Sequence, residues 1–377
     1  MTQVGEHGPA IRSDVWIAVM DASKAGYDLT TSVEAIYGQS IRRQVEAALG
    51  RFGNPNVHLE IRDSGALPFA LEARLEAALC SHLGLPLPAL PARTVPKRTH
   101  LRRTRLYVPG NGPKLFPNAG LYRPDGLILD LEDSVAPDAK FAALAMVRRA
   151  LTALDWDGSE RMVRVNQGEQ GMRDLMVVAS QGVEAFLLPK IEEPEQVREA
   201  ASRLDELGSE AVLLPLIESA AGIERAFEIA SSSPRVAAIT VGLEDYVTDL
   251  HAERTSEGRE SAYAQARIVN AARAAGVSPL ASVFPQVDDP DAMFEYARNA
   301  RGLGFDGVGC IHPRQIRAAH RAFAPSAEEL GDAAAIVAGF EAALAEGRGA
   351  VSVRGRMVDA PVYERAREVL ARGGAGS

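Results

Sequence analysis

The chain of 377 residues has only two cysteines, Cys80 and Cys310. Two cysteines cannot build a disulfide framework, and these two match no zinc-ligand spacing, so we expect a reducing compartment. The chain also lacks a basic block. Its formal net charge is −9 and its isoelectric point is about 5.4, which argues against a dedicated nucleic-acid binder.

Long hydrophobic runs are missing as well. No stretch approaches the length needed to span a membrane, and the N-terminus has no charged leader followed by an apolar core. We therefore expect a soluble, cytoplasmic protein without a membrane partner.

The length suits one large barrel plus a small domain. In residues 1–86, strand-like patterns at 15–20, 27–31 and 57–62 alternate with helical patterns at 33–49 and 67–83, and Ser32 is the expected cap of the first helix. This composition predicts a compact α+β domain. Residues 87–100 follow as a proline-rich linker, for which we expect an extended, semi-rigid connection; an ordered loop packed on the next domain is the alternative.

From residue 101 to 325, short apolar runs recur at regular intervals and helical segments fill most of the gaps. The apolar runs cover 105–108, 126–131, 162–165, 185–188, 212–217, 237–241, 279–283 and 307–311, and the helical segments cover 138–154, 194–207, 222–230, 261–275 and 291–303. Eight strands alternating with helices predict an α/β fold of the (β/α)8 TIM barrel type. A doubly wound open sheet is the alternative, but no Gly-rich dinucleotide fingerprint follows any strand.

Residues 326–377 read as C-terminal helices separated by a Gly/Val/Arg segment that ends at Asp359. Such a segment after a complete barrel suits a lid or a subunit contact. Asp359 could equally be a plain helix cap.

Two apolar runs end abruptly in carboxylates, Glu218 in the first and Glu244-Asp245 in the second, with a helix-like segment between them. In a βαβ unit both acids would lie at the C-terminal ends of neighbouring parallel strands, where barrel active sites form. Two close carboxylates repel each other unless a cation holds them, and two protein ligands suit Mg²⁺, which keeps several waters. The competing interpretation is that these acids only cap the following helices.

Arg164, also at a strand end, could bind a substrate carboxylate through two hydrogen bonds. A bound divalent ion would polarise a carbonyl or a hydroxyl, which suits aldol- or Claisen-type carbon–carbon cleavage of a 3-hydroxy thioester. Lys190 is the candidate for a Schiff-base mechanism instead, but it lies in Pro-Lys-Ile-Glu-Glu, where neighbouring acids keep it protonated.

Together these residues resemble the citrate lyase β subunit and related CoA-ester lyases. The resemblance runs in order from about 102 to 370 through Arg105-Leu-Tyr-Val-Pro-Gly110, Asp130-Leu-Glu-Asp-Ser-Val135, Val163-Arg-Val-Asn166, Ile217-Glu-Ser219, Gly242-Leu-Glu-Asp-Tyr246, Ile311-His-Pro-Arg-Gln315 and Gly355-Arg-Met-Val-Asp-Ala-Pro361. Residues 8–84 resemble the citrate lyase γ subunit, an acyl carrier, through Ser32-Val-Glu34, Gly38, Ile41-Arg-Arg43, Asp63-Ser-Gly-Ala-Leu67 and Ala73-Arg-Leu-Glu-Ala77. The chain therefore resembles a fusion of carrier and lyase.

The resemblance implies a Mg²⁺-dependent lyase that cleaves a citryl-, citramalyl- or malyl-type thioester into an oxo acid and an acyl thioester. It implies Glu218 and Asp245 as metal ligands, Glu218 also facing substrate, and Arg164 as the residue that binds substrate and stabilises developing negative charge. Asp359 matches a catalytic aspartate on a lid that is commonly delivered to a neighbouring subunit, which implies a homo-trimer or hexamer. The positions that hold the CoA thioester or CoA-derived carrier are matched by Tyr107, Lys114, Lys140, Ile311 and His312.

The carrier half departs from its family at the attachment serine. In the family this serine is followed by a small residue and then an aspartate, whereas this chain reads Arg12-Ser13-Asp14-Val15. Aligned on Asp14, the attachment position holds Arg12, and only a one-residue deletion makes Ser13 the attachment point. With Ser13 modified, the chain would be a carrier that an acyl-transferase subunit could load. Without the modification, the first domain is a structural relic or an assembly module, and the barrel acts on free CoA esters. The alternative function is a carrier-like scaffold subunit with little activity of its own.

Overall fold

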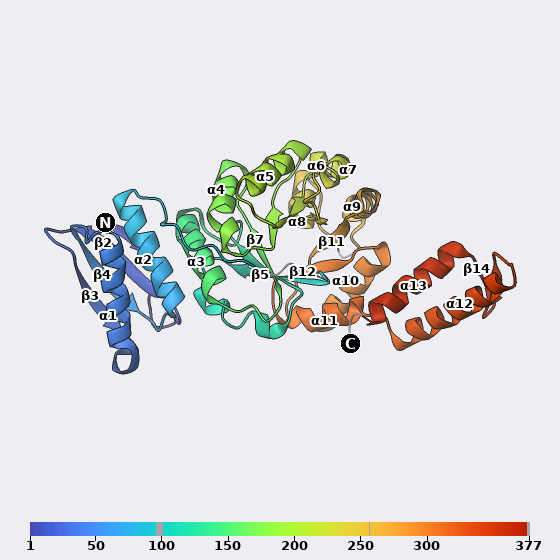
Figure 1. Ribbon diagram of the computed structural model, residues 1–377, viewed down its shortest axis with the longest axis horizontal. Coiled ribbons are helices and arrows are strands. Elements are labelled where there is room, and N and C mark those ends of the chain that lie inside the picture. Colours follow the sequence, from blue (N-terminus) through green and yellow to red (C-terminus); the bar gives the residue numbers. More distant parts are fainter. Residues whose placement is uncertain (96–100, 256, 375–377) are drawn as a thin grey trace.

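The computed structural model describes residues 1–95, 101–255 and 257–374 of the chain. A small N-terminal domain, a closed barrel and a C-terminal helical arm follow one another along the long axis of the molecule (Figure 1). The α/β barrel predicted from the alternation of apolar runs is confirmed. No helix in the described ranges is long and apolar enough to cross a membrane.

The N-terminal domain is a four-stranded sheet covered by two helices. The sheet has the order β1-β2-β4-β3, with β3 and β4 parallel and the other neighbours antiparallel. Its elements are β1 (Thr2–Val4), β2 (Val15–Asp21), β3 (Gly26–Thr31), α1 (Glu34–Arg51), β4 (Val57–Asp63) and α2 (Pro68–Leu83). The first strand, which is short and lies at the sheet edge, was not predicted.

The expected Ser32 cap of α1 is wrong. The N-cap position holds Val33, which makes no side-chain cap bond. The turn before the helix is instead closed by the Thr31 hydroxyl, which accepts a hydrogen bond from the Val33 backbone N–H at 3.1 Å. Ser32 lies in the turn directly after β3, and its backbone N–H donates to the Asp63 carbonyl at the end of the neighbouring strand at 3.1 Å.

Helix α2 joins the domain to the barrel because it is buried on two faces. Leu71 and Leu75 pack into the core of the small domain, while Phe69 and Ala73 belong to the large core of the barrel. The ring of Phe69 stacks on the ring of Phe116, with the ring centroids 6.3 Å apart. An α-helix normally buries one stripe, so this two-sided burial makes the small domain a fixed part of the molecule.

Buried charges reinforce this contact. Glu76 of α2 is fully buried and binds the guanidinium groups of Arg148 and Arg149, both on the first long barrel helix, α3 (Lys140–Ala153). Two arginines on one buried carboxylate satisfy both of its oxygens, which a buried charge requires. The domain interface is therefore a specific, desolvated contact.

The proline-rich span packs on the barrel as far as it is described. Arg148 donates to the Pro88 carbonyl, the Arg93 backbone N–H donates to the Ser180 carbonyl at 2.8 Å, and the Arg93 side chain donates to the Leu151 carbonyl at 2.6 Å. This span is thus an ordered loop, the second of the two interpretations of the sequence. Residues 96–100 lie outside the described part of the chain.

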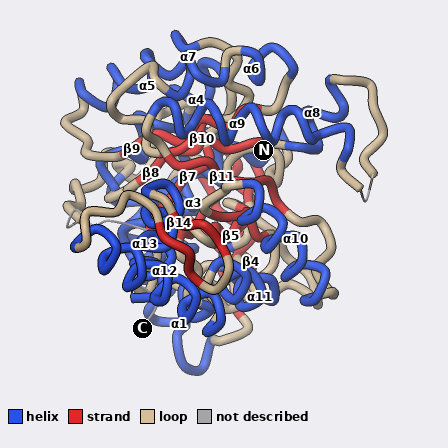
Figure 2. The backbone as a smooth tube through the Cα atoms, turned by 90° about the vertical axis from the view of Figure 1, so that its right-hand side faces the viewer, coloured by secondary structure: helices blue, strands red, loops and turns tan. Residues whose placement is uncertain are grey.

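Eight parallel strands close the barrel in the order β10-β11-β12-β5-β6-β7-β8-β9, inside a ring of helices (Figure 2). The strands are β5 (Thr104–Pro109), β6 (Gly126–Asp130), β7 (Glu160–Arg164), β8 (Ala185–Leu188), β9 (Val212–Ile217), β10 (Ala238–Val241), β11 (Ser278–Val283) and β12 (Gly307–Cys310). The helices are α3 (Lys140–Ala153), α4 (Gly168–Val178), α5 (Pro194–Glu206), α6 (Ala220–Glu224), α7 (Ala226–Ala230), α8 (Leu243–Asp249), α9 (Ala262–Ala275), α10 (Pro290–Leu303) and α11 (Arg314–Phe323).

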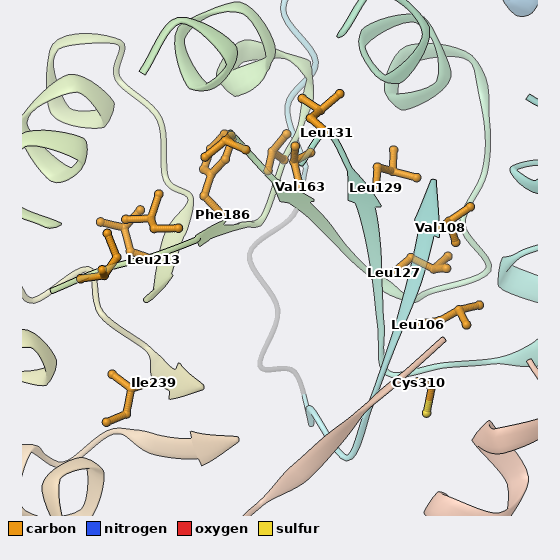
Figure 3. Packing of buried hydrophobic residues seen from close by; sticks show 14 of the residues in the cluster. Leu106, Val108, Leu127, Leu129, Leu131, Val163, Phe186, Leu213, Ile239 and Cys310 are labelled. Atoms are coloured by element: carbon orange, nitrogen blue, oxygen red, sulfur yellow. The ribbon is translucent and has the colours of Figure 1, made fainter. Parts of the chain in front are cut away.

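The barrel has an outer and an inner apolar layer. Leu106, Val108, Leu127 and Leu129 point from the strands to the helices and belong to the large outer core (Figure 3). Their neighbours along each strand point inward, and a smaller cluster that includes Ile128, Met162, Leu187, Leu214 and Leu280 fills the lumen. Inward positions at the carboxyl ends of the strands are free to carry the polar residues of a site.

Cys80 and Cys310 are buried free thiols whose pKa values burial raises to about 11 and about 12.

Beyond the barrel, α12 (Ala327–Ala345) and α13 (Ala360–Gly374) form an antiparallel arm with the hairpin of β13 (Val351–Val353) and β14 (Arg356–Val358) between them. Figure 1 shows the arm projecting away from the barrel, with β14 at its far end. Helix α12 begins with a capping box in which Ser326 and Glu329 exchange side-chain and backbone hydrogen bonds.

Candidate active site

A cavity of about 440 Å³ opens at the carboxyl ends of the barrel strands. Its wall combines charged groups from the strand ends with apolar groups from the lumen. It is lined by Tyr107, Pro109, Asp130, Asp133, Ser134, Arg164, Leu216, Glu218, Thr240, Val241, Gly242, Leu243, Glu244, Asp245, Ala281, Ser282, Val283 and Ile311.

Glu218 and Asp245 both face this cavity. Glu218 directly follows β9, and Asp245 lies in the first turn of α8, which follows the neighbouring strand β10. Lys190 links the two acids: its backbone N–H donates to Glu218 Oε1 at 2.9 Å, and its Nζ lies 3.2 Å from Asp245 Oδ2. The two predicted metal ligands are thus brought together at one point of the rim.

The electrostatics of this pair favour a bound cation. Burial and the nearby negative charge of Asp245 raise the pKa of Glu218 to about 8. Burial and a second carboxylate both disfavour ionisation of this carboxyl. A divalent ion bound by the two groups would stabilise the ionised form of both. Within the described ranges no group of three or more His, Cys, Asp or Glu side chains gathers in metal-binding geometry. A two-carboxylate donor set fits Mg²⁺, which fills its other positions with water and substrate oxygens.

The Glu218 side chain occupies the space that a side chain at position 242 would need. A Cβ atom added to Gly242 would lie 2.8 Å from Glu218 Cβ and nearer still to Glu218 Oε2. The orientation of the Glu218 carboxylate therefore depends on the missing side chain at the start of α8.

Arg164 is held rigidly at the end of β7. It donates two hydrogen bonds to the Asp130 carboxylate, at 2.6 and 2.7 Å, and its Nη1 lies 2.9 Å from Glu132 Oε2. Its guanidinium lies over the Tyr107 ring at 5.3 Å from the ring centroid. Burial alone would lower the pKa of Arg164, but the hydrogen bonds and charge of Asp130 outweigh burial and raise it. Arg164 is therefore a permanent, oriented positive charge in the cavity wall.

Glu132 is a member of the site to which the sequence assigned no role. It is only 4 % exposed, and burial raises its pKa well above the ordinary value, although the Arg164 charge opposes this shift. Its position directly after a strand was visible in the sequence. Its contact with Arg164 was not, because the register between β6 and β7 sets that contact.

Lys190 does not have the surroundings of a Schiff-base lysine. Burial lowers the pKa of its ammonium, but the hydrogen bond to Asp245 and the negative charge of Asp245 outweigh burial and raise it. A nucleophilic lysine needs a lowered pKa, so the site supports the metal interpretation over the Schiff-base one.

The predicted thioester-binding residues divide into two groups. Tyr107 and Ile311 line the cavity, and the Ile311 side chain is 42 % exposed. Lys140 instead donates to the Leu131 and Glu132 carbonyls at 2.8 and 2.6 Å, so it stabilises the loop after β6.

The other two thioester-binding candidates also lie outside the cavity lining. Lys114 lies on the short 3₁₀ turn η1 (Pro113–Leu115), and the His312 ring accepts a hydrogen bond from the Arg314 N–H at 3.2 Å.

Asp359 lies far from the cavity of its own chain. It directly follows β14 at the far end of the arm, where its Oδ1 accepts a hydrogen bond from the Val362 N–H at 3.3 Å (Figure 1). This is the cap-like contact that the sequence allowed as an alternative. In this structure Asp359 does not line the cavity of its own chain.

Ser13 lies in a loop at the junction of the two domains. It is half-buried, its φ is +60°, and its backbone N–H donates to the Ser64 carbonyl at 3.0 Å. The next residue, Asp14, binds Arg74 through two hydrogen bonds of 2.9 and 3.0 Å, and Arg74 also donates to the Asn111 carbonyl of the barrel at 3.0 Å. Arg12 is exposed and donates to the carbonyls of Pro9 and Ile11.

Comparison with known proteins gives two family matches. Residues 103–313 match the HpcH/HpaI aldolase/citrate lyase family, and residues 6–82 match the malonate decarboxylase delta subunit (MdcD) family of acyl carrier proteins. The chain is 40 % identical to the citrate lyase β subunit of Escherichia coli, over 73 % of this chain and 94 % of that protein. It is 33 % identical to the L-malyl-CoA/β-methylmalyl-CoA lyase of Cereibacter sphaeroides, over 76 % of this chain and 96 % of that protein.

Comparison with solved structures gives relatives of the same kind. The CitE protein of Mycobacterium tuberculosis, in complex with magnesium, acetoacetate and coenzyme A, superposes with a TM-score of 0.63 at 34 % identity, covering 72 % of this chain and 98 % of that one. The citrate lyase β subunit of the same organism, complexed with oxaloacetate and magnesium, gives a TM-score of 0.52 at 33 % identity and covers 59 % of this chain and 96 % of that one. The Escherichia coli relative is named as a subunit of a lyase and the Cereibacter sphaeroides relative as a lyase, so the prediction of a lyase is confirmed. The chain belongs to the HpcH/HpaI aldolase/citrate lyase family and carries an acyl-carrier-like domain at its N-terminus.

Proposed function

We propose that the barrel is a Mg²⁺-dependent carbon–carbon lyase that cleaves a 3-hydroxy-acyl thioester into an oxo acid and an acyl thioester. The observation that carries this proposal is the meeting of Glu218, Asp245 and Arg164 at one cavity on the barrel rim. Relatives in complex with magnesium and an oxo acid or coenzyme A support it.

In this proposal Glu218 and Asp245 hold the metal, which when bound acts as a Lewis acid on the oxygen of the reacting carbon. Arg164 binds the carboxylate of the oxo-acid half and offsets negative charge that develops during cleavage. The substrate hydroxyl loses its proton, the adjacent carbon–carbon bond breaks, and its electron pair passes to the acyl thioester as an enolate. Protonation of the enolate carbon then completes the acyl thioester.

Asp359 serves in proton transfer, to or from the hydroxyl or the enolate carbon. Because Asp359 follows β14 at the far end of an arm that projects away from the barrel, we propose that a neighbouring copy receives it, in a homo-trimer or hexamer. Tyr107 and Ile311 would contact the thioester in the cavity, and Lys114, Lys140 and His312 would bind its carrier portion along the rim.

The N-terminal domain would supply the carrier function in the same chain. Ser13 is the attachment point in this proposal, and an acyl-transferase subunit would load it. A second candidate function, a carrier-like scaffold with little activity of its own, is favoured by one observation: the small domain is fixed to the barrel through a buried charged interface.

A substrate panel tests the lyase proposal. Purified protein is assayed with Mg²⁺ against citryl-, malyl- and citramalyl-CoA, and we expect an oxo acid to be released from at least one of them. Glu218→Ala should abolish turnover and Mg²⁺ binding together, whereas Glu195→Gln, at an exposed carboxylate outside the cavity, should change neither. Retained turnover of Glu218→Ala with added Mg²⁺ would overturn the metal assignment.

Intact-mass measurement tests the carrier proposal. A CoA-derived adduct that disappears in Ser13→Ala would support attachment at Ser13. An unmodified chain that cleaves free CoA esters would support the lone enzyme and reduce the N-terminal domain to an assembly role.

A further inference from the structure

Lys190 touches both proposed metal ligands, but with different parts of the residue. Its backbone N–H fixes Glu218, and its ammonium pairs with Asp245. Its φ is +52°, in the left-handed region that is unfavourable for a residue with a side chain. Strain of this kind persists where the surrounding structure requires a particular geometry. Here it allows one residue to face both acids.

The Lys190 ammonium lies at an end of the barrel where carboxylates gather. Four carboxylates, those of Glu132, Asp133, Glu218 and Asp245, lie at this end of the barrel, and the Lys190 ammonium lies 3.2 Å from the Oδ2 atom of Asp245. The second cation of the site, Arg164, pairs with the acids at and after the end of β6, which are Asp130, Glu132 and Asp133. Among the residues that the structure describes, Lys190 is the basic side chain that pairs with Asp245.

We propose that the Lys190 ammonium is a built-in counter-ion that occupies the cation position beside Asp245 in the metal-free enzyme and withdraws when Mg²⁺ binds. This inference rests on the proposed metal site at Glu218 and Asp245. In the metal-free enzyme the Lys190 ammonium would neutralise Asp245, and it would compete with Mg²⁺ for that carboxylate.

The geometry permits the withdrawal. The Lys190 side chain is 38 % exposed and the Asp245 side chain 43 % exposed, so the ammonium can rotate on its flexible stem into solvent. The backbone contact to Glu218 does not need to move with it. A lysine is suited to this exchange, because its point charge makes no rigid two-pronged contact with the carboxylate.

Removing the ammonium should therefore tighten Mg²⁺ binding. A unit charge about 4 Å from a divalent ion opposes its binding even in a water-like dielectric, so Lys190→Met should lower the Mg²⁺ dissociation constant by about tenfold. Lys190→Arg keeps the charge and should leave the dissociation constant within about threefold of the wild-type value. In both variants the backbone N–H that bonds Glu218 remains.

The experiment is a calorimetric titration of the full-length protein with MgCl₂, in low salt and after treatment with a chelator. Wild type is compared with Lys190→Met, Lys190→Arg, Glu218→Ala and the matched control Lys24→Met, which removes an exposed lysine of the small domain. Circular dichroism of each variant shows whether it is folded, and Lys190→Gln replaces Lys190→Met if the latter is not.

The outcomes separate the two proposals. Tighter binding in Lys190→Met, with Lys190→Arg and Lys24→Met near wild type, supports the counter-ion. Wild-type binding that Glu218→Ala abolishes, combined with unchanged or weaker binding in Lys190→Met, overturns the counter-ion and leaves the metal site standing. No Mg²⁺ binding by the wild type would overturn the metal site, and the counter-ion with it.

Discussion

The buried carboxyl of Glu218 makes the stability of the metal-free protein depend on pH in a direction opposite to that of most acids. Its pKa is raised to about 8 from an ordinary value of 4.5, because it is buried and faces Asp245. Between these two values the folded chain keeps a proton that the unfolded chain has released. The stabilising contribution of this proton is fully present below about pH 4.5 and is lost as the pH rises through 8.

The size of the effect follows from the shift. Each pKa unit is worth about 1.4 kcal/mol, and relaxation around a group that is still 7 % exposed reduces the full difference. We expect the metal-free protein to lose about 2–4 kcal/mol of unfolding free energy through this group between pH 5 and pH 8. Mg²⁺ should remove most of this loss, because the ion binds the deprotonated carboxylate and so binds more tightly as the pH rises.

The assay is urea unfolding at a series of pH values with a chelator, in wild type and in Glu218→Gln. Glutamine has the same shape and cannot ionise, so the difference between the two curves isolates this carboxyl from Glu132, whose raised pKa acts in the same direction. A Trp16→Phe background leaves Trp156, buried in the barrel, as the fluorescent reporter of the barrel transition. Parallel pH dependences of wild type and Glu218→Gln would refute the reasoning.

Three further substitutions test separate parts of the site and the fold. Gly242→Ala should weaken Mg²⁺ binding at least about tenfold in calorimetry because the new methyl group displaces Glu218, while Gly50→Ala, where nothing lies within 4 Å, should not. Arg164→Lys keeps the charge but loses the two-pronged contact that orients it, so kcat/KM should fall by about 100-fold or more while thermal unfolding changes little. Glu76→Gln leaves two arginines of α3 without their buried carboxylate, and thermal unfolding should show a loss of about 3–5 kcal/mol or a separate transition of the small domain; an unchanged single transition would contradict a structural role for this interface.

The barrel and the residues of its rim could be predicted from the sequence because both follow from local patterns. A short apolar run followed by a charged residue specifies a strand and its carboxyl end, and parallel pairing brings these ends together; this is why Glu218 and Asp245 meet. Which way a rim side chain turns is decided by contacts that have no local signal. Lys140 lies after the loop that follows β6 and donates to a carbonyl of that loop. Glu132 contacts Arg164 on the neighbouring strand, and the pairing register of the two strands decides this contact.

Two of the helices that escaped prediction, α4 and α8, have a physical reason in common. Helix α4 contains two glycines and starts at one with a positive φ, so its composition resembles a loop. Helix α8 is only seven residues long and follows directly from a strand. Both are stabilised by packing against the barrel rather than by their own propensity, and tertiary packing cannot be seen in a single segment.

The interface between the two domains has a consequence for how a carrier could work in this chain. Helix α2 is part of both cores, and the chain of contacts from Asp14 through Arg74 to Asn111 ties the Ser13 loop to a barrel residue two positions beyond Pro109, which lines the cavity. A freely swinging carrier domain would need to break a buried interface with two ion pairs on Glu76. A prosthetic group on Ser13 would therefore have to reach its reaction partners through its own flexible length, starting from a fixed point beside the rim. The same fixed placement explains why a domain without any attached group would still be retained as a structural part of the barrel.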